Sequence, residues 1–276
     1  MINAYFQKMV GGARSAMVGS AVLATAVTVS ACLVLAQEPS FPSAAEATQT
    51  LFQAVQSNNT DAIAKILGGP TDLTSCGDPA QDQRDREMFV QKYKEMNRLG
   101  RDADGAQTLY IGSENWPFPI PLVEKDGAWR FDMDRGRKEV MYRRIGENEL
   151  RAILICHELV AAEKQFRANP KTVSQVDSLL VPLVSAAAKG PTGADPVLIH
   201  GYYFRAVANR QGQGKVAGGF GFVAYPAEYR SSGVMTFIAT EKDIVTEKDL
   251  GTNTATLASA LTTSSREKDW VPSDDK

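Results

Sequence analysis

The hydrophobic pattern of this chain changes its period near residue 200, and this change constrains the fold more than any other feature. Before it, apolar residues recur mostly at the three- and four-residue spacing of helices. After it, short strand-like runs follow each other at residues 202–208, 220–225, 234–239 and 244–248, separated by Gly-rich or charged segments. Strands at such short spacing predict an antiparallel β-meander. We therefore expect an α+β fold.

The first half should pair helices with a small antiparallel sheet. A capping box at Ser43 and Glu46 begins one helix, and others are expected over residues 61–67 and 78–99. The charged side chains between residues 82 and 87 alternate in sign, which favours a solvated helix face. By shape, these helices and the following sheet resemble a nuclear-transport-factor-like cone, an analogy that carries no function.

The small sheet is predicted from residue 108 onward. Residues 116–123 place prolines at alternate positions, and because proline donates no backbone hydrogen bond, this segment should lie at a sheet edge or cover the sheet. Asp126-Gly127 predicts a hairpin turn, after which Trp129 and Phe131 share one face of the returning strand.

A helical stretch from Arg135 to Gly146 leads into the longest helix, residues 147–168. Its stripe of Leu150, Ile153, Leu154 and His157 should pack on the strands of residues 116–132, which would make His157 a buried core residue. Prolines and glycines in residues 169–199 indicate a linker with a short helix. The expected organisation is an export signal (1–36), a helix-plus-sheet region (37–168), the linker (169–199) and the meander with a polar tail (200–276).

The N-terminus has the pattern of an export signal. Lys8 and Arg14 precede an uncharged run, residues 16–36, that ends in small residues before Gln37. Cleavage between Ala36 and Gln37 would leave a periplasmic or secreted protein. Two alternatives stay open: a lipoprotein anchored through Cys32, and an uncleaved anchor of 21 uncharged residues. All three place the bulk of the chain outside the cytoplasm.

Charge and cysteine content limit the remaining functions. Without residues 1–36 the chain keeps 28 of its 30 Lys+Arg and all 32 Asp+Glu, a net charge of −4. A mildly acidic chain does not hold nucleic acid by bulk charge, and no second long apolar run predicts a membrane span. Cys76 and Cys156 are either a disulfide, which an oxidising compartment permits, or two unrelated thiols.

Several long motifs resemble a known family. They are WPFPIP at 116–121, WRFD at 129–132, RRIG at 143–146 with NEL at 148–150, HGYYFR at 200–205, AYPAEY at 224–229, GVMTFI at 233–238 and KDLG at 248–251. Together they resemble the bacterial exported "domain of unknown function 2950" family over nearly all of the chain after the leader. The resemblance implies export and no nameable activity. Relatives carry an Asp/Gly-rich, aromatic segment that residues 169–199 lack, so a family site in that segment would be absent here.

No catalytic or cofactor signature is complete in this sequence. His157-Glu158 lacks the second histidine of a zincin, and Gly212-Gln213-Gly214-Lys215 lacks the flanking residues of a phosphate loop. With two histidines in the chain, no metal centre or cofactor is predicted. An enzyme would have to use acids such as Asp132 or Glu149 in a cone-shaped pocket.

Two surface features keep a binding role open. The basic run Arg135, Arg137, Lys138, Arg143 and Arg144 suits an anionic envelope polymer, although a solvated face paired with nearby glutamates is the preferred explanation. The aromatic residues Trp116, Phe118, Trp129, Tyr202, Tyr203 and Tyr225 suit a groove or a packed core. His200, Tyr202 and Arg205 form an alternative binding strand.

These features favour a non-catalytic envelope scaffold or binding protein that contacts another envelope protein or an anionic polymer. A cone-pocket enzyme and a small-ligand binding module are the alternatives. The enzyme requires a pocket with at least two converging ionisable groups, whereas the scaffold requires a flat, exposed aromatic or basic patch.

Overall fold

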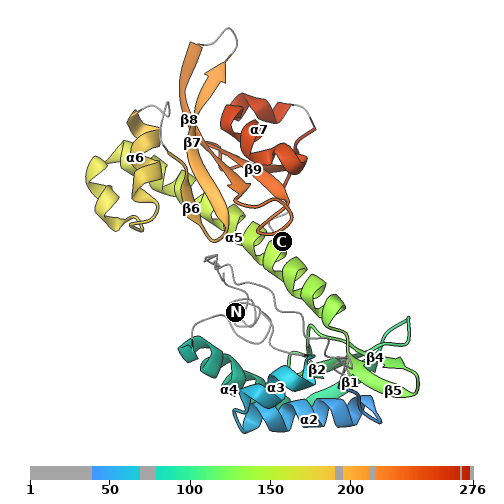
Figure 1. Cartoon of the computed structure of the whole chain (residues 1–276). Coiled ribbons are helices and arrows are strands. Elements are labelled where there is room, and N and C mark those ends of the chain that lie inside the picture. The colour runs from blue at the N-terminus through green and yellow to red at the C-terminus, as the bar shows by residue number, and fades with distance from the viewer. Residues whose placement is uncertain (1–38, 69–78, 190–194, 212–214, 268, 274–276) are drawn as a thin grey trace, which may run out of the picture. The chain divides into compact units, whose positions relative to one another are not determined.

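The structure is a computed structural model that describes residues 39–68, 79–189, 195–211, 215–267 and 269–273. The chain divides into two compact units, unit 1 (Met1–Val140) and unit 2 (Met141–Lys276), and the boundary falls inside the long helix α5 (Met133–Ala168) (Figure 1). The predicted division after residue 168 lies elsewhere, at the end of that helix. Both units combine helices with antiparallel sheets, which confirms the α+β fold class.

Unit 1 opens with helices α2 (Ala44–Gln56), α3 (Thr60–Ile66) and α4 (Pro79–Glu95). The Ser43 hydroxyl accepts a hydrogen bond from the Glu46 backbone N–H at 3.1 Å, as the capping box predicts, and Asn59 caps α3 in the same way. Helix α4 ends earlier than predicted because residues 97–101 enter the sheet as strand β1.

The prediction that residues 82–87 of α4 form a solvated face is wrong at two positions. Asp82 keeps 5 % of its surface exposed and Asp85 none, although Glu87 is exposed. Alternation of sign along a sequence does not reveal which carboxylates turn inward, because neighbouring helix residues point about 100° apart.

The sheet of unit 1 runs in the order β1-β2-β4-β5, with strand β3 also paired to β2. Its strands are β1 (Asn97–Arg101), β2 (Gln107–Ile111), β3 (Trp116–Pro117), β4 (Leu122–Lys125) and β5 (Ala128–Phe131). The proline-spaced segment contributes the two residues of β3 and then covers the core. Trp116, Phe118 and Ile120 point inward and are buried.

The hairpin between β4 and β5 turns at Asp126 and Gly127, as predicted. Both residues have positive φ, 55° and 74°, which a two-residue turn of the tight type requires and which glycine adopts without strain. The register pairs Lys125 with Ala128 and Val123 with Arg130. Lys125 and Arg130 therefore stand on the same face of the hairpin.

Helix α5 is continuous over 36 residues and passes through Gly146, where a break was expected. A glycine inside a helix costs only about 1 kcal/mol relative to alanine. The expected core stripe is right at Ile153, which is 8 % exposed, but wrong at Leu150 and Leu154, which are 53 % and 62 % exposed. Cys156, Leu159 and Val160 are fully buried instead. These inward residues pack in the core of unit 2, not on the strands of residues 116–132.

Unit 2 is built on an antiparallel meander in the order β11-β10-β9-β8-β7-β6, which confirms the predicted meander. The four expected strands are β7 (Tyr202–Gln211), β8 (Lys215–Pro226), β9 (Met235–Thr240) and β10 (Val245–Asp249). Two short strands, β6 (Val197–Ile199) and β11 (Val271–Pro272), extend the sheet at its edges. The turn at residues 212–214 lies outside the described residues.

Helices cover both faces of this sheet. Phe204, Phe222 and Phe237 form one core with α5 and with α6 (Val181–Lys189), while Val223 and Ile238 face α7 (Thr254–Ala260) on the other side (Figure 1). Short 3₁₀ turns at Pro170–Gln175, Gly251–Asn253 and Thr263–Glu267 complete the unit. The short helix expected within the linker is α6, and it packs in the core of unit 2.

Candidate functional site

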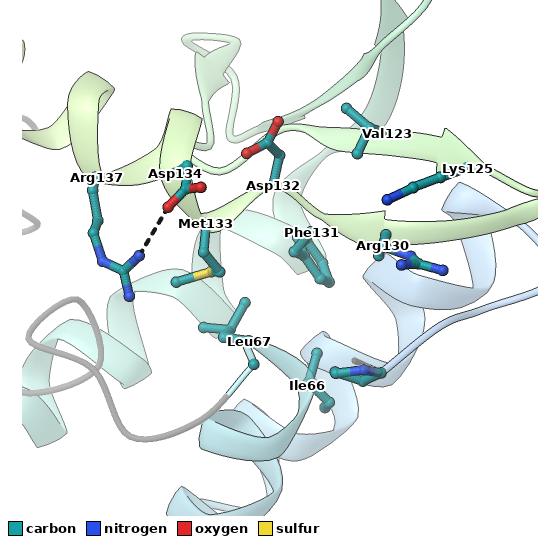
Figure 2. Close-up of a pocket in the computed structure, with 12 residues that line it drawn as sticks. Ile66, Leu67, Val123, Lys125, Arg130, Phe131, Asp132, Met133, Asp134 and Arg137 are labelled. Carbon is teal, nitrogen blue, oxygen red and sulfur yellow. Dashed lines mark hydrogen bonds and ion pairs between the residues drawn. The ribbon is translucent and has the colours of Figure 1, made fainter. Parts of the chain in front are cut away.

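A cavity of about 310 Å³ opens in unit 1 between the end of α3, the β4–β5 hairpin and the first turns of α5 (Figure 2). This volume is at the lower end of the range found for ligand pockets. The residues lining it are Pro39, Ile66, Leu67, Gly68, Val123, Lys125, Arg130, Phe131, Asp132, Met133, Asp134 and Arg137. An apolar floor is thereby combined with cations and carboxylates.

Local structure places the ionisable groups around the floor. Lys125 and Arg130 come from the hairpin, where the register puts them on one face. Asp132 caps α5, because its Oδ1 accepts a hydrogen bond from the Arg135 backbone N–H at 3.0 Å. Asp134 and Arg137 follow in the first turns of the helix.

Both carboxylates of the pocket are already engaged. Besides capping the helix, Asp132 places its Oδ2 3.2 Å from Arg135 Nε, and Asp134 lies 3.2 Å from the guanidinium of Arg137. Arg135 also binds Asp104 of the β1–β2 turn. The Ala106 N–H and the Arg135 guanidinium lower the pKa of Asp104, and the same contact raises the pKa of Arg135.

The site has the chemistry of anion binding. Three cations, Lys125, Arg130 and Arg137, line it with two carboxylates, of which Asp134 pairs with Arg137 and Asp132 shares Arg135 with Asp104. The described residues that line the pocket include no histidine, cysteine, serine or tyrosine. Arg137 belongs to the predicted basic run, but Lys125 and Arg130 were missed. The Asp-Gly turn was the available signal, because its register places both side chains on one face.

The aromatic residues considered for a groove lie in cores. Trp116 and Phe118 are 8 % and 6 % exposed and pack edge to face, with ring centres 6.5 Å apart. Trp129 is partly buried on β5, where its backbone pairs with Phe41. Tyr202 is fully buried in unit 2, and its hydroxyl donates to the Met235 carbonyl at 2.9 Å.

The other predicted binding residues occupy separate places in unit 2. Arg205 donates to the carbonyls of Ala258 and Leu261 at the end of α7, and burial lowers the pKa of its guanidinium. His200 is exposed in the tight turn between β6 and β7 with a φ of 46°. Arg143 and Arg144 are half-buried on α5, and both have interaction partners.

Glu149, the second acid considered for catalysis, holds a loop. Its Oε1 accepts the backbone N–H groups of Val234 and Met235 at 2.8 and 3.0 Å, and the neighbouring Asn148 side chain donates to the Ser232 carbonyl. Glu149 belongs to unit 2 and Asp132 belongs to unit 1.

His157 is not the buried core residue that was expected. Its side chain is 27 % exposed, and Nδ1 lies 2.7 Å from Asp243 Oδ1 in the turn between β9 and β10. Cys156 is fully buried, which raises the pKa of its thiol to about 12. Cys32, Ala36, Gln37 and Cys76 lie outside the described residues, so the cleavage site, the lipid anchor and the disulfide remain predictions.

The described residues form neither a metal-binding cluster nor a membrane-spanning helix. No group of three or more His, Cys, Asp or Glu side chains among them is arranged to hold a metal ion. No helix in this part of the chain combines the length and the apolar character needed to cross a membrane.

Comparison with known proteins gives one match. The chain matches no curated protein and no solved structure. The family described as "Protein of unknown function (DUF2950)" matches residues 38–189 and 170–272. These two ranges together cover most of the chain. The chain therefore belongs to the DUF2950 family.

Proposed function

We propose that this chain is an exported binding protein that holds an anionic ligand in the pocket of unit 1 without turning it over. The observation that carries the proposal is the convergence of Lys125, Arg130 and Arg137 on an apolar floor of ligand-pocket size. Arg130 is half-buried, so its charge is less screened than the charges of Lys125 and Arg137, whose side chains are exposed.

Engagement of the carboxylates favours binding over catalysis. General acid–base chemistry needs a group that can exchange a proton with the ligand. Both oxygens of Asp132 face Arg135, and Asp134 pairs with Arg137. The enzyme alternative rests on Asp132 lining the pocket. If Asp132→Asn abolishes turnover of a captured ligand while the ligand still binds, the enzyme is correct and the binding protein is not.

Export is the second part of the proposal, and it rests on the leader. Cleavage after Ala36 would release a protein beginning Gln37-Glu38-Pro39 into the periplasm or medium. N-terminal sequencing of the exported protein tests this. A lipid-modified Cys32 at the start would replace the soluble protein by an anchored one, and an intact leader in a membrane pellet that resists alkali would indicate the uncleaved anchor.

Native mass spectrometry of the full chain after export tests the ligand proposal. We expect a small anion to copurify with the protein and to be chemically unchanged when it is released after incubation. The double variant R130E/R137E should not retain this anion. The variant R143E/R144E carries the same change of charge outside the pocket and is the matched control. If only the control loses the anion or its envelope association, the basic run on α5 is the binding surface and the pocket is not.

A further inference from the structure

Cations occupy opposite ends of the pocket in unit 1. Figure 2 shows Arg137, from α5, at one side and Lys125 and Arg130, from the β4–β5 hairpin, at the other. Phe131 and Met133 lie between them, above Ile66 and Leu67. We propose, building on the anion-binding function above, that the ligand is a short aliphatic dianion with an anionic group at each end and an apolar spacer.

The floor between the cations suits a hydrocarbon spacer. Ile66, Leu67 and Phe131 keep between 5 % and 8 % of their surfaces exposed, and the Met133 thioether adds an adaptable apolar contact. A spacer lying on these side chains would itself leave water and would cover the small apolar surface that they still expose. A compact inorganic anion, in contrast, would reach one end of the pocket and leave this floor uncovered.

The volume sets the size of the ligand. A cavity of about 310 Å³ is at the lower end of the range for ligand pockets, so it suits a small ligand of on the order of ten non-hydrogen atoms. A saturated six-carbon dicarboxylate has this size. Much longer chains would have to extend out of the pocket.

The acidic residues of the pocket are partly compensated by arginines. Asp132 shares Arg135 with Asp104, and the backbone N–H and Nε of Arg135 both face Asp132. Arg137 pairs with Asp134, but their side chains are 48 % and 90 % exposed. Exposed pairs of this kind contribute little to stability, so a ligand carboxylate can replace Asp134 at Arg137 at small cost.

Calorimetric titration of the full chain at low ionic strength tests the ligand class with three six-carbon probes: adipate, hexanoate and hexane-1,6-diol. We expect adipate to bind at least about tenfold more tightly than hexanoate, because each end then meets a cation, and the diol not to bind. Arg137→Gln should lower adipate affinity to that of hexanoate and leave hexanoate binding unchanged, whereas Arg137→Lys should retain part of the preference.

Lys138→Gln is the matched control, because Lys138 is exposed on the same helix and does not line the pocket. Circular dichroism shows whether each variant is folded. If Arg137→Gln is not folded, the adipate and hexanoate affinities of Arg137→Lys decide whether Arg137 binds the second carboxylate. Equal affinities for adipate and hexanoate would overturn the dianion and leave the anion-binding function in place. If neither carboxylate binds, the dianion is refuted. The anion-binding function of the pocket would then be supported only if mass spectrometry finds a different anion.

Discussion

The direction in which α5 faces can be tested with two leucines that lie five residues apart. Leu159 is fully buried against the sheet of unit 2, and Leu154 is 62 % exposed. Leu159→Ala removes three carbons from a closed core, a loss of about 2.4 kcal/mol at about 0.8 kcal/mol per carbon. The cavity left behind raises the expected cost to about 3–5 kcal/mol.

Leu154→Ala removes the same atoms from an exposed position. Little transfer free energy is lost there, and alanine has the higher helix propensity, so the free energy of unfolding should change by less than about 0.5 kcal/mol. Urea denaturation followed by circular dichroism at 222 nm measures both variants. The assigned face of α5 is refuted if the two variants lose equal stability or if Leu154→Ala loses more.

Three further predictions concern buried or half-buried side chains of unit 2. Glu149→Ala should leave the N–H groups of Val234 and Met235 without their acceptor and cost about 1–3 kcal/mol, with faster hydrogen exchange there, whereas Glu149→Gln should retain most of the protection. Burial raises the pKa of Glu163, so its contribution to stability is present below its unfolded pKa and is lost as pH rises through the folded pKa. Glu163→Gln should therefore gain in melting temperature relative to the parent from acid to neutral pH, and a constant difference would contradict this. Cys156, buried with a raised pKa, should resist alkylation in the folded, reduced protein and react in urea, as peptide mapping can show.

The elements with strong local signals were predictable. The Asp126-Gly127 turn, the capping box at Ser43 and the period-two strands of unit 2 each depend on contacts close in sequence or on alternation. Strand β1 was missed because Asn97–Arg101 has little apolar character and forms only by pairing with β2. Its stability comes from a neighbour, which the local sequence does not reveal.

The inward face of α5 was not predictable from spacing, for a physical reason. Leucine and isoleucine occupy several sides of the helix between residues 150 and 155, so two faces compete for the core. The sheet of unit 2 presents Phe204, Phe222 and Phe237 toward α5, and packing against those large rings selects the face that carries Leu159. The leucines on the other face stay exposed.

The candidate site shows where sequence reasoning reaches its limit in this chain. The basic run at residues 135–144 predicted a binding surface for anions. Within it, Arg135 binds Asp104 and Asp132, and Arg137 pairs with Asp134. The pocket instead draws one cation from the helix and two from the hairpin strands. Charges that converge in space need not be neighbours in sequence, and charges that are neighbours can neutralise each other locally. Convergence in space, and not the density of basic residues along the sequence, therefore decides which cations of this protein line the pocket.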